Sequence, residues 1–258
     1  MSDALHAEWT KQRTVAGPAW LLLGAIAVTV ALSAIVASAV TYASAGSDQD
    51  LTKLSLTGVY IGQAIVAILA VQSITGEYST GMIHLTLTAT PRRHTVLAAK
   101  AAILSALVLG SGTLAVLVSI LLGRLILPSN GFTTAHGYTM LSLSHGPTLR
   151  AATGSVLYLT LIALMSLGIA TAVRDPAIAI GIVLGLLYLF PIIAALLADP
   201  TLHRHLQQIG PMTAGLTIQD TTNTDHLPIG PWAGLGVTAG WAAATMITGS
   251  LLLTFRDG

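Results

Sequence analysis

Residues 150–199 read RAATGSVLYLTLIALMSLGIATAVRDPAIAIGIVLGLLYLFPIIAALLAD. The stretch holds two apolar runs of 23 uncharged residues each, separated by the charged pair Arg174-Asp175. As α-helix, each run would extend about 34 Å at 1.5 Å per residue, slightly more than the ~30 Å hydrocarbon core of a bilayer. The stretch therefore predicts two membrane-spanning helices joined by a tight turn at residues 174–176.

The composition of the chain agrees with a location in lipid. Of its 258 residues, 53% are apolar and only 8% are charged, whereas a soluble domain carries roughly a quarter charged residues. A net charge of +1 and an aromatic content of 5% favour neither a basic surface nor base stacking, so we expect no nucleic-acid partner. The chain has no cysteine, which excludes disulfides and thiol catalysis.

The spacing of charged residues marks four further spans, because a charge at the bilayer centre costs a few kcal/mol. The intervals Lys53–Glu77 and Lys100–Arg124 also enclose 23 uncharged residues each. One more apolar run lies near each end of the chain, whereas the turn-rich interval between Arg124 and Arg150 predicts a loop. We expect an all-α polytopic membrane protein with six transmembrane helices, at residues 19–41, 55–75, 101–123, 151–173, 177–198 and 232–254.

The orientation follows from the basic residues outside the spans, since loops rich in lysine and arginine stay in the cytoplasm. Six spans place both termini on one side of the membrane. That side carries seven basic residues and the other side four: Lys11, Arg13, Arg92, Arg93, Lys100, Arg174 and Arg256 against Lys53, Arg124, Arg150 and Arg204. We therefore expect both termini in the cytoplasm.

Three segments outside the spans are candidates for function. Residues 1–16 place Leu5 and Trp9 on one helical face, which predicts an interfacial helix, although a frayed chain start could show the same pattern. Residues 77–97 form the longest cytoplasmic connection, and their periodicity fits a strand as well as a helix. Residues 199–231 form a long external loop whose apolar residues leave open whether part of it re-enters the bilayer.

The sequence lacks the residues that most chemistry would need. None of its three lysines follows a glycine, so the chain has no P-loop for ATP, and no predicted span contains a histidine for hydrolysis. His203 and His205 have no carboxylate or cysteine cluster nearby and make a poor metal site. No charged residue lies inside a predicted span, which disfavours ion coupling, although an unwound helix could bind an ion through carbonyls. We expect no catalytic residue, metal or cofactor in this chain, and no enzyme activity of its own.

The connection between the second and third spans carries a resemblance to a known family. Its pattern is Glu77-Tyr78-x-x-Gly81, then Pro91-Arg92-Arg93, then Lys100 leading into the third span. Together with six spans and a long last external loop, this pattern resembles the permeases of bacterial ATP-binding-cassette (ABC) transporters, in the type-two exporter class. The opening Glu8-Trp9-Thr10-Lys11 is also similar to the start of many bacterial members.

The resemblance implies a half-transporter in the bacterial cell membrane. Two six-helix subunits, identical or homologous, pair around a central path, and each rests on a separate ATPase subunit that binds ATP and Mg²⁺. The segment from about Tyr78 to Thr90 is then a coupling helix seated on the ATPase, with the N-terminal helix as the connecting helix beside it. The residues implied to couple to the ATPase are Glu77, Tyr78, Gly81, Pro91, Arg92 and Arg93.

Within that set, Glu77 would brace the end of the second span against the coupling and connecting helices. Arg92 and Arg93 have an alternative role, which is to hold the loop at the membrane surface through lipid phosphates.

The family also implies candidates for the substrate path and for subunit pairing. Its second and fifth spans line the path, which makes Tyr60, Gln63, Tyr188 and Phe190 candidate wall residues. Close helix approach, within the subunit or across a dimer, is indicated by three small-residue pairs: Gly58 with Gly62, Gly181 with Gly185, and Gly236 with Gly240. Packing within the subunit is the alternative for each of these residues.

A path without fixed charge suits an apolar or amphipathic substrate, such as a drug, antibiotic, lipid or peptide. We therefore expect the permease subunit of an ATP-driven exporter. Two other classes stay open: an ion-coupled secondary transporter, which needs no ATPase, and a non-transporting membrane sensor or assembly subunit.

Overall fold

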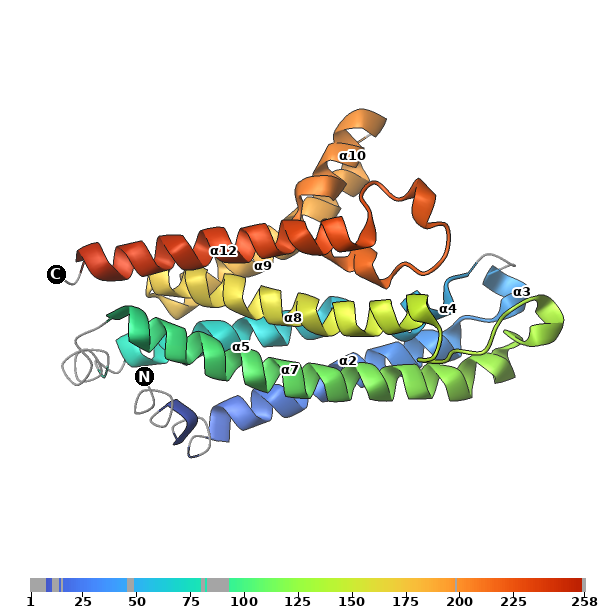
Figure 1. Cartoon of the computed structure of the whole chain (residues 1–258), viewed down its shortest axis with the longest axis horizontal. Helices are drawn as coiled ribbons and strands as arrows, with labels where there is room; N and C mark the ends of the chain where they lie inside the picture. The colour runs from blue at the N-terminus through green and yellow to red at the C-terminus, as the bar shows by residue number, and fades with distance from the viewer. Residues whose placement is uncertain are drawn as a thin grey trace.

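The computed structural model describes residues 8–10, 14, 16–45, 49–79, 82, 93–197 and 199–256. Within these residues the chain forms helices and turns and contains no strand, and six long helices lie side by side in a bundle (Figure 1). They are α2 (Ala16–Ala39), α5 (Val59–Ser79), α7 (Arg93–Ile126), α8 (Gly146–Val173), α9 (Pro176–Leu196) and α12 (Pro231–Arg256). Each is long and apolar enough to cross a membrane. The prediction of an all-α polytopic membrane protein is confirmed.

Successive long helices run in opposite directions, so the bundle has two distinct ends (Figure 1). At the end we name the Lys100 end, α5, α8 and α12 finish and α7 and α9 begin. The opposite end, named the α4 end, holds short helices that include α3 (Tyr42–Ala45), α4 (Leu51–Ser55), η1 (Leu127–Asn130) and η2 (Thr134–His136). The described parts of the predicted interfacial helix (1–16) and coupling segment (77–97) lie at the Lys100 end, and the rest of both segments lies outside the described residues.

The long helices extend beyond the spans that charge spacing delimits. The third, α7, has 34 residues and a length of about 51 Å, so roughly 20 Å of it exceeds the hydrocarbon core. Lys100 accordingly lies inside the helix, about two turns after its first residue. The second predicted span begins differently too, because a turn at residues 56–58 separates α4 from α5.

Helix α8 forms the centre of the bundle and packs against α5, α7, α9 and α12. Its sequence suits this position because small residues are interspersed with large apolar ones, and Tyr158, Ile162 and Met165 are fully buried. By contrast, α2 and α9 lie at the periphery and expose large apolar side chains such as Trp20 and Ile182. Apolar outer surfaces of this kind are what lipid requires of a spanning bundle.

The long loop after α9 is structured and turns back into the bundle. It contains α10 (Pro200–Ile209), which projects away from the bundle in Figure 1, then α11 (Pro211–Gly215), η3 (Leu216–Gln219) and η4 (Thr224–His226). Helix α11 packs against α9 and α12, and η3 packs against α8 and α12. Met212 is 2% exposed and Ile218 is fully buried. Met212 and Ile218 of this loop thus belong to the protein core, whereas Leu202 and Ile209 of α10 are exposed.

Candidate functional site

Three charged side chains form a buried cluster at the Lys100 end. Lys100 Nζ donates hydrogen bonds to Glu8 Oε1 at 2.7 Å, to Glu77 Oε1 at 2.6 Å and to the Ser73 carbonyl at 3.3 Å. The side chains of Lys100, Glu8 and Glu77 are 1%, 9% and 3% exposed. Ser73 and Glu77 are one turn apart on α5, so one ammonium group on α7 reaches both.

The cluster fixes three segments to one another. A buried charge is costly unless it is paired and hydrogen-bonded, so each carboxylate depends on the ammonium group and the ammonium group on them. Glu8 comes from the N-terminal segment, Glu77 from the last turn of α5, and Lys100 from a position about two turns into α7. Helices α5 and α7 flank residues 80–92, the larger part of the predicted coupling segment.

A second contact at this end involves the turn between α8 and α9. The guanidinium carbon of Arg174 lies 5.2 Å from the ring centroid of Tyr78, a cation–π geometry. Arg174 ends α8 in the left-handed region with φ 68°, and Asp175 begins α9 by accepting a hydrogen bond from Ile178 N at 2.8 Å. The tight turn expected at residues 174–176 therefore lies against the end of α5.

The described residues include some of the predicted ATPase-coupling positions. Glu77 joins the buried cluster and Tyr78 contacts Arg174. Gly81, Pro91 and Arg92 lie outside the described residues, and of Arg93 only the backbone, at the first position of α7, is described. The site also contains Glu8, which sequence reasoning did not predict as a site residue. The sequence shows only that Glu8 is an acidic residue near the start of the chain, and it indicates no partner for this carboxylate.

Three of the four predicted path residues meet in one polar network near the α4 end of α5. Gln63 Nε2 donates to the Tyr60 carbonyl at 2.9 Å, and Tyr188 Oη donates to the same carbonyl at 2.7 Å. The rings of Tyr60 and Tyr188 lie edge to face, with centroids 5.6 Å apart. Phe190 lies elsewhere, next to Gly210 at the turn between α10 and α11.

Two residues that sequence reasoning missed complete this network. The Tyr158 hydroxyl donates to Gln63 Oε1, and Gln63 Nε2 lies 2.9 Å from Met212 Sδ. Because Gln63 and Tyr158 are fully buried, the amide joins α5, α8 and α11 inside the subunit. Tyr60, at 39% exposed, is the member of the network that faces outward. Tyr158 lies in the apolar run 156–159, where nothing in the sequence indicates a partner on α5.

The three glycine pairs divide into two kinds. A Cβ atom at Gly58 or Gly62 would overlap Thr29 of α2, and Gly58 N donates to Ser33 Oγ at 3.0 Å. This pair therefore packs the start of α5, together with the turn before it, against α2 within the subunit. A methyl group added at any glycine of the other two pairs would meet no atom within 4 Å, so these pairs lie on open helix faces: Gly181 and Gly185 on α9, Gly236 and Gly240 on α12.

The α4 end has its own ionic and hydrogen-bonded contacts. Lys53 Nζ donates to Asp220 Oδ1 at 2.6 Å. Asp50 caps α4 by accepting from Lys53 N at 3.0 Å, and it also accepts from the Thr221 hydroxyl at 2.7 Å and from Thr222 N at 3.1 Å. The loop after η3 is thus held against the start of α4. Among the described residues, no group of three histidine or acidic side chains is placed to hold a metal ion.

Comparison of the sequence with protein-family models gives no matching family, and comparison with curated proteins gives no matching relative.

Proposed function

We propose that the chain is the permease subunit of an ATP-driven ABC exporter of the type-two class. It would pair with a second permease subunit, identical or homologous, and with two ATPase subunits that bind ATP and Mg²⁺. Three features support this: six spanning helices, the lack of a P-loop and the resemblance of residues 77–100 to the family. The observation that carries the proposal is the Glu8–Lys100–Glu77 cluster.

The cluster gives the proposed coupling a physical route. A force on residues 80–92 would act on the end of α5 and the start of α7, which lie on either side of that segment in the chain. Because Lys100 joins these two helices to each other and to Glu8, they would move as one body with the N-terminal segment. ATP shifts the equilibrium between two conformational states of the permease if the ATPase binds ATP more tightly in one state than in the other.

The proposed substrate is apolar or amphipathic, such as a drug, antibiotic, lipid or peptide. In support, the described charged side chains of the long helices gather toward the two ends of the bundle, as with Lys100 and Arg150. A charged substrate would meet no compensating group midway among the described residues. The proposed location is the bacterial cell membrane, with both termini in the cytoplasm.

Reconstitution with its ATPase tests the proposal. The chain is purified from its native membrane together with any ATPase that co-purifies with it, reconstituted in liposomes, and assayed for ATP turnover and export. We expect turnover that the chain alone lacks, and a loss of both turnover and export with Glu77→Gln. Asp199→Asn is the matched control, because this exposed carboxylate caps α10 at the other end of the bundle. Transport driven by an ion gradient without the ATPase would overturn the proposal.

A further inference from the structure

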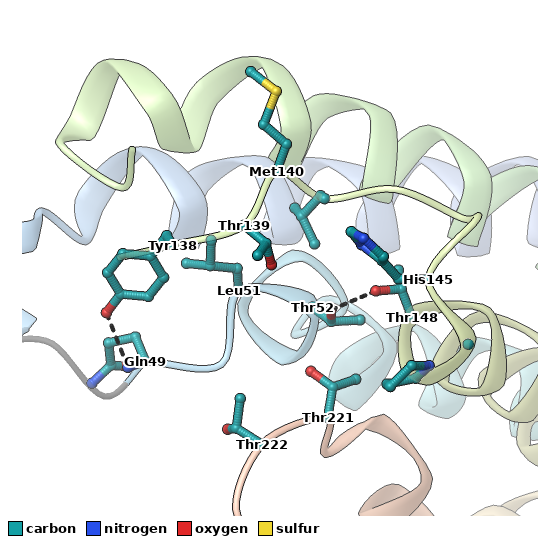
Figure 2. A pocket seen from close by; sticks show the side chains of 13 residues that line it. Gln49, Leu51, Thr52, Tyr138, Thr139, Met140, His145, Thr148, Thr221 and Thr222 are labelled. Atoms are coloured by element: carbon teal, nitrogen blue, oxygen red, sulfur yellow. Dashed lines mark hydrogen bonds between the residues drawn. The ribbon is translucent and has the colours of Figure 1, made fainter. Parts of the chain in front are cut away.

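A cavity of about 340 Å³ opens at the α4 end. Three segments that are distant in sequence form it: residues 49–52 at the start of α4, residues 138–148 before and within the start of α8, and Thr221-Thr222 after η3. Figure 2 shows Thr52, Thr148 and Thr221, one from each segment, lying close together, whereas Met140 points away from them. Its volume lies at the lower end of the range typical of small-molecule sites, about 300–1,000 Å³.

The lining is polar without being charged. Five threonine hydroxyls, a tyrosine hydroxyl, an amide and an imidazole border the cavity together with a few apolar side chains; the polar lining residues are Thr52, Thr139, Thr148, Thr221, Thr222, Tyr138, Gln49 and His145. Leu51 and Leu141 are the buried apolar ones, whereas Met140 is 61% exposed and lies at the rim. Within the described part of the chain, no aspartate, glutamate, lysine or arginine lines the cavity.

The adjacent charged side chains are engaged with other groups of the protein and do not line the cavity. Asp50 is occupied by Thr221 and Thr222, and Lys53 pairs with Asp220. The same contacts hold two walls in place, since Asp50 joins the start of α4 to the loop after η3. Tyr138 Oη accepts from Gln49 N at 3.2 Å, which fixes the third wall (Figure 2). The cavity is therefore formed before any ligand binds, which reduces the entropy cost of binding.

We infer that this cavity binds a neutral, multiply hydroxylated ligand of the size of a sugar ring. A hydroxyl group both donates and accepts hydrogen bonds, so threonine side chains such as Thr139 match ligand hydroxyls in either direction. The Thr221 hydroxyl donates to Asp50 and can therefore only accept from a ligand. A charged ligand would find no opposite charge in the lining. A purely apolar ligand would exclude water from the hydroxyl groups of Thr52 and Thr148. These two groups would then keep only the 3.4 Å hydrogen bond between them. Leu51 and Leu141 suit the C–H face of such a ring.

Ligand binding in this cavity is independent of the proposed transport function. Under the predicted orientation the cavity faces the outside of the cell, but binding can be measured on the purified chain without an ATPase or a gradient. A failed transport assay would leave the binding result intact, and the reverse also holds.

The test uses the full chain in lipid nanodiscs and saturation-transfer NMR. The neutral probes are methyl glucoside, methyl galactoside and N-acetylglucosamine, and the charged probes are glucuronate, glucosamine and glucose 6-phosphate. We expect the affinity for a neutral sugar to exceed the affinity for its charged analogues by a factor of about ten or more. Thr148→Val should weaken that binding about fivefold through loss of one hydrogen bond.

A bulky substitution separates binding in the cavity from binding elsewhere. Thr139 is exposed and lines the cavity, so the larger side chain of Thr139→Trp should fill the cavity and abolish the signal. Thr248→Trp is the matched control, because Thr248 is exposed on α12 and lies outside the cavity lining. The inference is overturned if none of the three neutral sugars binds at millimolar concentration, if charged analogues bind equally well, or if Thr139→Trp leaves binding unchanged.

Discussion

Lys100 of α7 and Glu77 of α5 form an ion pair of 2.6 Å in which neither side chain is more than 3% exposed. With Glu8 as the second acceptor, this pair joins the N-terminal segment to two long helices. Breaking a buried pair from one side is costly, because the remaining charge keeps its desolvation penalty and loses its partner. The pair is therefore the place where a single substitution should affect both stability and coupling.

The substitution Lys100→Met would remove the ammonium group from which both buried carboxylates accept hydrogen bonds. We expect the unfolding free energy to fall by about 3–5 kcal/mol, measured by thermal unfolding in detergent. Lys53→Met is the matched control, since Lys53 is 53% exposed in its pair with Asp220, and this substitution should cost less than Lys100→Met because solvent screens the half-exposed pair. Adding Glu8→Gln and Glu77→Gln to Lys100→Met should recover part of the loss. Equal effects of the two lysine substitutions would contradict the prediction.

The amide of Gln63 should depend on its buried tyrosine partner. Tyr158→Phe removes the hydroxyl that donates to Gln63 Oε1 in a fully buried site, so we expect a loss of about 1–3 kcal/mol. Tyr60→Phe changes a ring that is 39% exposed and should be close to neutral. Chemical unfolding of both variants in the same detergent measures the difference. A neutral Tyr158→Phe would show that the amide finds another donor.

Glycines that share the same spacing should respond differently to an added methyl group. At Gly58 this group would overlap the Thr29 carbonyl of α2, whereas at Gly236 it would meet no atom within 4 Å. Gly58→Ala should therefore lower the unfolding free energy by about 1–3 kcal/mol, and Gly236→Ala should leave subunit stability within about 0.5 kcal/mol. Thermal unfolding measures both variants, and equal losses would contradict the prediction. Size-exclusion chromatography of Gly236→Ala reports separately on subunit pairing.

The start of α10 should respond to acid. Hydrogen bonds from the Thr201 hydroxyl and from the Thr201 backbone N–H lower the pKa of the Asp199 carboxyl below its ordinary value of 3.8. Because the pKa of Asp199 is lower in the folded protein, its ionised carboxylate stabilises α10 at every pH above the ordinary pKa. This stabilisation is lost as the pH falls through the folded-state pKa. Carbon-detected NMR titration should find the pKa below 3.8, and Thr201→Val should raise it. An unchanged pKa in that variant would refute the assignment.

Charge spacing predicted the six spans well because lipid penalises every unpaired charge in the same way. Charge spacing placed Lys100 at the start of a helix, because it cannot reveal that Glu8, 92 residues away in the chain, pairs with this lysine. The fold supplies Glu8 as that partner and lets α7 continue through the lysine. Glu77 was predicted to brace its helix, and the structure adds the ammonium group through which it can do so.

Motif spacing was a weaker guide within the helices. Gly58 and Gly236 each have a second glycine four residues later, yet the first is packed against α2 and the second is open. Which face of a helix meets a neighbour depends on tertiary packing, and spacing along one helix does not encode it. The cavity at the α4 end was beyond sequence reasoning for the same reason, because its threonines come from three distant segments.

The central position of α8 has a consequence for how the protein is made. Gly168 of α8 and Gly249 of α12 let these two helices touch backbone to backbone, and α12 leaves the ribosome after α8 because it follows α8 in the chain. Until it emerges, the small-residue face of α8 is uncovered in the membrane. A translation product that stops before α12 would thus leave this face of α8 exposed to lipid, so the two helices can close their backbone contact only once α12 has been made.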